Sequence, residues 1–267
     1  MQKIYAQAAI GSQSLSGSRK WIRGEYNTHW HEFYEIEYIL SGDGAYTLNG
    51  EKRAFEAGML FFVSPADFHS VDTPGAEIIN LMFRPELASP GCLVPLTTGV
   101  EAKCICLIPR DRELVEALLE EILRHQEDGS YHAALLDCLL MKLSRCLELP
   151  PEGKIGSAAR KMEFFILNHF RERITLADAA AYVGLTPSYA SAVFKKEMGV
   201  NFKAALNSLR FDYAKKLLRW SDMTVAQICG ESGFEDYPNF IRRFKERFGL
   251  PPARLRRDAG ESGAAGA

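Results

Sequence analysis

The chain has 267 residues, of which 47% are hydrophobic and 25% are charged, and its formal net charge is −2. This length allows two domains, and the composition is that of an ordinary globular protein. No run of about 18 apolar residues is present, and no long apolar core follows Lys3, which argues against a membrane span and a signal peptide. We therefore expect a cytoplasmic protein.

The small net charge hides an uneven distribution along the chain. Residues 1–154 contain 14 Lys and Arg against 22 Asp and Glu, whereas residues 155–257 contain 18 against 10. A basic third joined to an acidic remainder favours a polyanion-binding module attached to a second domain. Because basic surfaces are common on other proteins too, this interpretation needs a supporting motif.

Residues 21–110 are predicted to be all-β. Alternating or short apolar runs such as YEIEYIL (34–40) and GMLFFVS (58–64) are separated by turn signals, among them SGDG and the hairpin pair Asn49-Gly50. Many short strands at close spacing are typical of a β-barrel or sandwich.

Residues 111–148 are predicted to form a helical pair. The segment RELVEALLEEILRHQ places Leu114, Leu118 and Ile122 on one stripe, and YHAALLDCLLMKLSRCLEL repeats the pattern. Packing on the strands explains one apolar face of each helix. The surplus of apolar residues favours a dimerisation surface, so we expect a homodimer.

A break in the pattern separates this pair from the basic third. The segment LPPEGKIGS combines two prolines with two glycines and is the predicted linker, and the final DAGESGAAGA is predicted to be disordered. The predicted parts are a β domain at 1–110, the helical pair at 111–148, the linker at 149–157, a helical domain at 158–257 and the tail at 258–267.

Two segments of the basic third, residues 174–200 and 223–250, resemble each other at an offset of 49 to 50 residues. Each opens with a threonine, has a small residue four positions before a glycine, and ends with a Phe-Lys pair and a second glycine. A small residue lets two helices approach closely, and a glycine permits a tight turn between them, so each copy predicts a helix-turn-helix. The paired positions are Ala180 and Cys229, Gly184 and Gly233, Phe194 and Phe244, Lys195 and Lys245, and Gly199 and Gly249.

Local signals frame the four expected helices. Thr175 and Thr224 are predicted N-caps of the first helices, and Thr186 and Asp236 of the second. Apolar anchors at i and i+4 would hold each second helix and leave its opposite face for DNA; they are Ala190, Phe194, Phe240 and Phe244.

The pattern from KMEFFILNHF (161–170) to GLPPARLR (249–256) resembles the DNA-binding domain of AraC/XylS-type transcriptional regulators. In that family two modules on one scaffold place their second helices in successive major-groove segments. By resemblance, the first recognition face is Ser188, Ser191, Ala192 and Lys195, and the second is Tyr237, Pro238, Ile241 and Arg242.

The two faces differ in chemistry. Arg242 can donate two hydrogen bonds to a guanine edge and Ile241 can contact a thymine methyl, whereas Ala192 has no polar atom. We therefore expect the second module to discriminate bases more sharply and the first to act more through phosphates. The predicted phosphate contacts are Lys195, Lys196, Arg243 and Lys245.

The N-terminal strands resemble a cupin barrel, the effector domain of many such regulators. GEYNTHWHEFYEIEYILSG (24–42) is similar to the first cupin motif and GMLFFVSPADFH (58–69) to the second, although Ala66 replaces the expected glycine and Thr73 the later asparagine. The resemblance implies that His29, His31, Glu35 and His69 converge. They suit a divalent transition metal, but with Glu37 they could instead contact a polar effector such as a sugar, or be structural.

The predicted architecture is multidomain: an all-β, cupin-like barrel followed by helices, then an all-α domain with two helix-turn-helix modules. The leading interpretation is a non-enzymatic, sequence-specific transcriptional regulator controlled by a small-molecule effector. The alternative is a cupin metalloenzyme or metal sensor fused to a DNA-binding domain, and a third class is a constitutive architectural protein. The expected partners are promoter DNA, the effector, a second copy of the chain and RNA polymerase.

Overall fold

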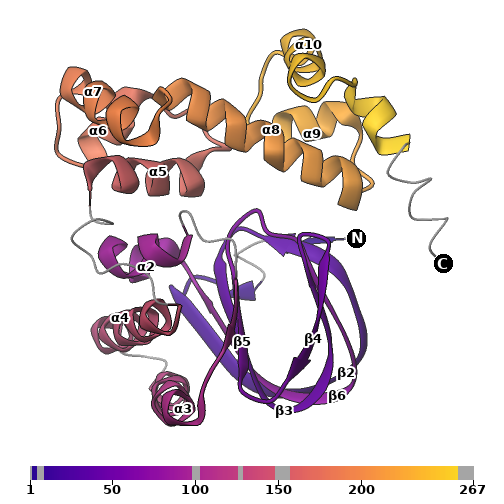
Figure 1. Cartoon of the computed structure of the whole chain (residues 1–267), viewed down its shortest axis with the longest axis vertical. Helices are drawn as coiled ribbons and strands as arrows, with labels where there is room; N and C mark the ends of the chain where they lie inside the picture. The colour runs from indigo at the N-terminus through magenta and orange to yellow at the C-terminus, as the bar shows by residue number, and fades with distance from the viewer. Residues whose placement is uncertain (1, 5–8, 98–102, 126–128, 148–156, 258–267) are drawn as a thin grey trace. The chain divides into compact units, whose positions relative to one another are not determined.

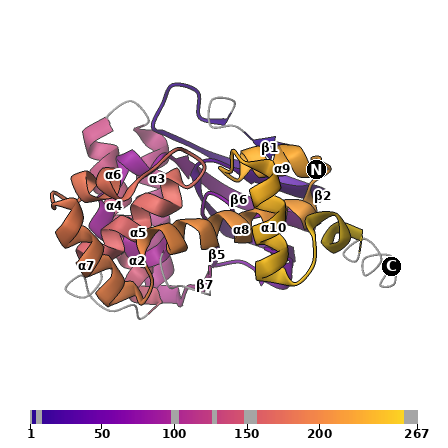
Figure 2. The ribbon, with the colours of Figure 1, turned by 90° about the horizontal axis from the view of Figure 1, so that it is seen from above.

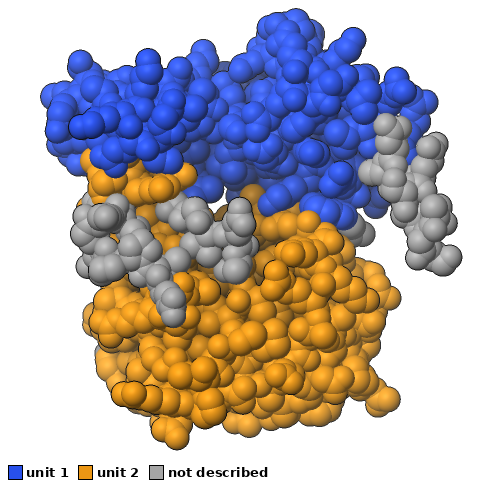
Figure 3. Space-filling view, in the orientation of Figure 1, with its two compact units in different colours: residues 1, 165–267 blue, residues 2–164 orange. Residues whose placement is uncertain are grey.

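The computed structural model describes residues 2–4, 9–97, 103–125, 129–147 and 157–257. The predicted tail and, apart from Ser157, the predicted linker lie outside these residues. The chain forms two compact units that divide between Phe164 and Phe165 (Figure 3). Among the described residues, no helix has both the length and the apolar character needed to cross a bilayer.

The N-terminal unit is a curved sheet with helices packed beside it (Figure 1). Its strands run in the order β1-β2-β6-β3-β5-β7, with β4 paired to β3, and all pairs are antiparallel except β1 with β2. The strands are β1 (Gln2–Ile4), β2 (Leu15–His31), β3 (Tyr34–Leu48), β4 (Glu51–Glu56), β5 (Met59–Val63), β6 (His69–Phe83) and β7 (Cys104–Cys106).

Three of these strands are much longer than the predicted short ones. Strand β3 continues through SGDG, which the sequence pattern assigned to a turn. The strand bends there because its register shifts between Ile39 and Ser41, and Gly42 adopts a φ of 89°. The hairpin at Asn49-Gly50 is confirmed, with φ values of 52° and 87°.

Three helices cover one side of the barrel: α2 (Pro90–Thr97), α3 (Pro109–Arg124) and α4 (Gly129–Cys146), with the 3-10 turn η1 (Pro85–Leu87) leading into α2. Helix α2 lies in a region predicted to be all-β. Of the predicted stripe of α3, Ile122 is buried and Leu118 packs against the core, whereas Leu114 is 49% exposed. The other fully buried residues of the helix are Val115 and Leu119. These helices share one core with strand residues that include Tyr34, Ile36, Leu81 and Phe83.

Helix α5 (Ala158–His169) contains the boundary between the units. The second unit continues with α6 (Leu176–Tyr182), α7 (Pro187–Met198), α8 (Phe202–Trp220), α9 (Val225–Glu231) and α10 (Tyr237–Phe248), and a further helix follows at residues 252–257. Helix α8 contacts both α7 and α9, and α7 and α10 lie near its opposite ends (Figure 2). The predicted combination of a sheet-rich N-terminal part with a helical C-terminal part is confirmed.

Candidate functional site

Two helix pairs, α6 with α7 and α9 with α10, have the same local construction. Thr175 and Thr224 cap α6 and α9 through capping boxes completed by Asp178 and Gln227. The turns that follow contain Gly184 and Gly233, with φ values of 69° and 79°. Thr186 and Asp236 then cap α7 and α10 through side-chain oxygens that accept from backbone N–H groups. The predicted repeat is therefore present in the structure.

One face of each second helix is buried and the other is exposed. The four predicted anchors, Ala190, Phe194, Phe240 and Phe244, are fully buried. All the predicted contact residues of α7 are exposed, namely Ser188, Ser191, Ala192, Lys195 and Lys196. On α10 the exposed ones are Tyr237, Pro238, Arg242 and Lys245, whereas Ile241 and Arg243 are half-buried.

The guanidinium of Arg243 lies over the ring of Phe211, 5.6 Å from its centroid. This cation–π contact ties Arg243 to α8 and distinguishes it from the freely exposed Lys245. A phosphate contact by Arg243 stays a prediction, and it would have to share the guanidinium with this ring.

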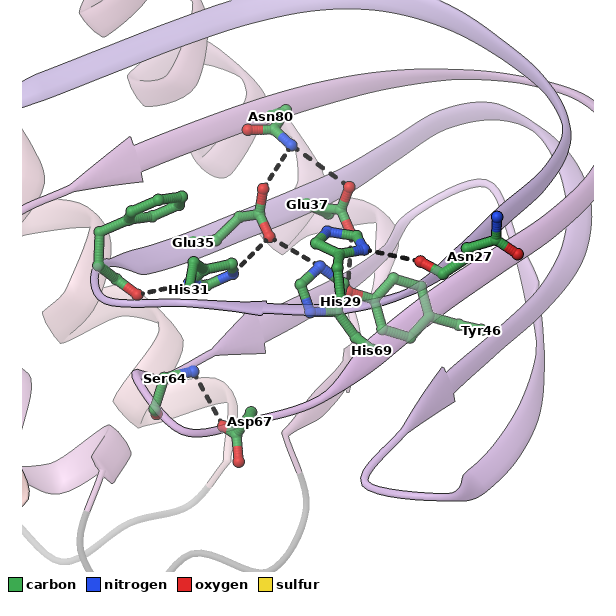
Figure 4. Close-up of polar contacts among 11 residues, drawn as sticks. Asn27, His29, His31, Glu35, Glu37, Tyr46, Ser64, Asp67, His69 and Asn80 are labelled. Carbon is green, nitrogen blue, oxygen red and sulfur yellow. Dashed lines mark hydrogen bonds and ion pairs between the residues drawn. The ribbon is translucent and has the colours of Figure 1, made fainter. Parts of the chain in front are cut away.

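Inside the barrel, polar side chains converge on Glu35 of strand β3 (Figure 4). His31 Nε2 and His69 Nε2 each lie 3.1 Å from the same carboxylate oxygen, Glu35 Oε2. Asn80 donates from Nδ2 to the other oxygen at 2.7 Å. Burial alone would raise the pKa of Glu35, but the hydrogen bonds from His31 and His69 outweigh it and hold the pKa well below its ordinary value.

Glu37, two residues further along β3, faces the same interior. Tyr46 donates to its Oε2 at 2.6 Å, and Asn80 Nδ2 approaches its Oε1 at 3.3 Å. Burial and then the neighbouring Glu35 charge raise the pKa of Glu37. In one buried site, the pKa of Glu35 is thus lowered and the pKa of Glu37 is raised.

His29 is more exposed than His31 and His69 and lies beside them. Its ring centroid is 4.1 Å from that of His69, and its Nδ1 donates to the carbonyl oxygen of Asn27 at 3.0 Å. Burial first, and then the charge of His69, lower its pKa to about 4. His29 is therefore neutral at pH 7, and its Nε2 presents a lone pair.

Three of the four predicted metal-ligating side chains come together. The ligand atoms of His31, Glu35 and His69 lie within 4.8 Å of one another, so a single ion could contact all three. Two imidazole nitrogens and a carboxylate oxygen are a donor set that fits a divalent transition metal. His29 packs against this group but does not belong to it.

Two polar atoms of the cluster have no hydrogen-bond partner among the described residues: His69 Nδ1 and Asn80 Oδ1. Buried polar atoms are normally paired, so unpaired ones in an interior cluster indicate a position for a bound group. Neither Asn80 nor Tyr46 was among the predicted site residues. Asn80 lies opposite Glu37 in the β3–β6 register, a relation that only the sheet pairing reveals.

Known proteins resemble both units. Residues 22–144 match a family model described as an AraC-like ligand binding domain, and residues 179–258 match one described as a helix-turn-helix domain. The HTH-type transcriptional activator RhaS of Escherichia fergusonii is 26% identical, covering 97% of this chain and 99% of its own. The probable transcriptional regulator LumQ of Photobacterium leiognathi is 23% identical, covering 85% of this chain and 90% of its own.

Among solved structures, ToxT from Vibrio cholerae covers 91% of this chain and 97% of its own at 12% identity, with a TM-score of 0.39. The relation of this chain to known proteins rests on the sequence matches to the two family models and to the curated relatives, and not on this structural likeness.

Proposed function

The chain belongs to the AraC-type transcriptional regulators, and from this premise we propose that α7 and α10 bind promoter DNA while a small-molecule effector in the barrel controls that binding. Ligand-binding and DNA-binding parts are then joined in one chain. An effector shifts the balance between two arrangements of these parts only if it binds one of them more tightly.

One observation carries the DNA-binding proposal. Two copies of one helix pair each have a buried anchor face and an exposed face, in the third of the chain that carries an excess of 18 basic over 10 acidic residues. We expect Arg242 to read guanine and Ile241 to contact thymine, with lysines on phosphates.

The experiment is a binding-site selection on full-length protein with a randomised DNA duplex. We expect an enriched motif with two separate segments, and loss of one guanine position in Arg242→Ala. Arg219→Ala, an exposed arginine on α8, removes the same charge and should leave the motif unchanged. Failure to enrich any motif at low ionic strength would overturn the proposal.

We further propose that the effector is rich in hydrogen-bond donors or positively charged, and not an anion. A carbonyl oxygen can only accept, so the Nδ1 atoms of His29 and His31, facing the carbonyls of Asn27 and Phe33, carry hydrogens. Because His29 is neutral, its Nε2 is then an acceptor, as are the carboxylate of Glu35 and the unpaired Asn80 Oδ1. A polyol such as a sugar satisfies this set through its hydroxyl groups.

A divalent transition metal is a second candidate occupant, held by His31, Glu35 and His69. The specific observation is that the ligand atoms of these three buried side chains lie within 4.8 Å of one another. Such an ion would supply an electrophilic centre for the oxygens of an effector. The named relatives are regulators, so we propose no catalytic role.

Native mass spectrometry of freshly purified protein separates these occupants. A polyol, an amine or a metal ion retained by the wild type and lost in Glu35→Gln supports the acceptor-rich site. A retained carboxylate or phosphate compound would contradict it, because the cluster offers such a group few donors.

We also propose that the chain is a homodimer whose seam uses α3 and α4. Supporting this, Leu114 of α3 and Met141 of α4 are 49% and 43% exposed, outside the core of the unit. Light scattering should give a dimer at micromolar concentration, and Leu114→Glu combined with Met141→Glu should give a monomer.

RNA polymerase is the last proposed partner. Stimulation of transcription by purified polymerase and this protein would test that proposal.

A further inference from the structure

The recognition helix α10 holds its central arginine between two neighbours on the same face. Arg242 donates from Nη2 to Asn239 Oδ1 at 2.8 Å and from Nη1 to Glu246 Oε1 at 2.6 Å. These residues precede and follow Arg242 by three and four positions, the spacings at which helix side chains meet. We propose that Asn239 and Glu246 are positioning residues that hold the Arg242 guanidinium for base reading; this rests on the proposed DNA-binding function.

The hydrogen bonds to Asn239 and Glu246 leave the guanidinium able to bind a base. A guanidinium has five N–H donors, and these two hydrogen bonds use two of them. The side chain of Arg242 is 64% exposed, so the remaining donors are accessible from solvent. A guanine edge needs two parallel donors, for its O6 and N7 atoms.

Holding the side chain in advance matters because arginine is flexible. Ordering a long side chain at an interface costs conformational entropy, and a side chain that is already ordered loses less of it on binding. The pair with Glu246 is exposed, so its direct contribution to the stability of the fold is small. Its effect is therefore expected in base discrimination rather than in folding.

The first module lacks this device. Aligned by their caps, Thr186 and Asp236, and by their anchors, Phe194 and Phe244, helices α7 and α10 have matching positions. Asn239 then corresponds to Tyr189 of α7, Arg242 to Ala192 and Glu246 to Lys196. The positioned arginine is thus a property of the second module, which agrees with its expected sharper discrimination.

The test measures, on full-length protein, the affinity ratio between the selected operator and the same duplex with its Arg242-dependent guanine replaced. This ratio reports base reading, which a general change in charge does not move. We expect Glu246→Ala and Asn239→Ala each to lower the ratio about two- to fivefold, the effect of an exposed pair worth up to about 1 kcal/mol. Glu246→Gln keeps an acceptor and should largely restore the ratio.

Two controls separate positioning from electrostatics. Glu246→Ala and Glu246→Gln remove the same negative charge, so both should strengthen binding to non-specific DNA equally. Glu197→Gln makes the same charge change on α7 and should leave the ratio unchanged. In the double variant Asn239→Ala with Arg242→Ala, the ratio should match that of Arg242→Ala alone.

The outcomes are distinct. If Arg242→Ala lowers the ratio but Glu246→Ala and Asn239→Ala do not, the positioning inference is wrong while the DNA-binding proposal stands. If Glu246→Ala raises the ratio, Glu246 competes with DNA for Arg242, which also overturns the inference. If Arg242→Ala leaves the ratio unchanged, the assignment of base reading to Arg242 itself fails.

Discussion

His29 shows how one residue of the barrel makes stability depend on pH. Its pKa is about 4 in the folded protein against 6.5 for a free histidine. As the pH falls below 6.5, the unfolded chain takes up a proton that the folded chain does not, so the free energy of unfolding decreases until about pH 4. A shift of this size corresponds to about 3 kcal/mol at the lower end of that window.

We predict that His29→Asn removes most of this part of the pH dependence, because asparagine does not titrate and can still donate to the carbonyl of Asn27. Urea unfolding of chelator-treated protein at pH 7 and pH 5 measures it. His125→Asn, a change at an exposed histidine, should keep the wild-type slope. An unchanged slope in His29→Asn would show that other groups cause the loss.

The bend of strand β3 at Gly42 belongs to the scale of elements. Gly42 and Gly24 have nearly equal φ values, 89° and 88°, and both occur where a strand changes register. A Cβ at Gly42 would overlap the carbonyl oxygen of Gly75, whereas a Cβ at Gly24 meets nothing within 4 Å. The two sites therefore separate backbone strain from close approach.

We predict that Gly24→Ala lowers the free energy of unfolding by about 1–2 kcal/mol, the cost of a strained φ. Gly42→Ala adds a backbone overlap and should cost about 2 kcal/mol more, or prevent folding. Urea unfolding of the two variants and wild type measures the difference. Equal losses would mean that the strands shift easily at Gly42.

In the second unit, Arg210 of α8 fastens the segment that precedes α6. It donates to the carbonyl oxygens of Phe170 and Glu172, each at 2.6 Å. Gly233, in the turn of the second module, closely approaches both Phe170 and Arg210. One arginine therefore helps to fix the turn that sets the direction of α10.

We predict that Arg210→Ala lowers the free energy of unfolding by about 2–3 kcal/mol, because two charge-assisted hydrogen bonds are lost. Arg219→Ala, at an exposed position of the same helix, should change it by less than about 0.5 kcal/mol. Urea unfolding monitored by circular dichroism tests both. If both variants changed the free energy of unfolding by a similarly small amount, contacts other than those of Arg210 would hold the turn.

The elements differ in how far the sequence could predict them. Caps such as Thr224 and turn glycines such as Gly233 act within a few residues, so the two modules could be predicted from local patterns. The long strands could not be predicted in this way. The segment SGDG, which contains Gly42, has the composition of a turn, and only its pairing with β6 makes it part of a strand. In the candidate site, the resemblance to the first cupin motif implied His31 and Glu35, but Asn80 depends on the register between distant segments.

Charge separation is a property of the whole molecule. The net charge is −2, yet the residues from 155 to 257 contain 18 basic and 10 acidic side chains. DNA bound at the basic residues interacts mainly with the charges near it. Salt screens its interaction with acidic side chains more than about 10 Å away at 0.1 M ionic strength. Binding to DNA by a chain of slightly negative total charge is thus consistent with its distribution.

We predict that the logarithm of the DNA affinity falls linearly with the logarithm of salt concentration, since bound phosphates release counterions. Lys195→Ala should reduce this slope by about 0.9 and weaken specific and non-specific duplexes alike, because a phosphate contact carries no base information. Arg242→Ala should instead weaken the specific duplex far more than the non-specific one. Affinities measured by fluorescence anisotropy between 50 and 200 mM salt, roughly the range over which phosphate contacts respond strongly, distinguish the two. A Lys195 variant that changed base preference would assign that lysine to a base edge rather than to the backbone.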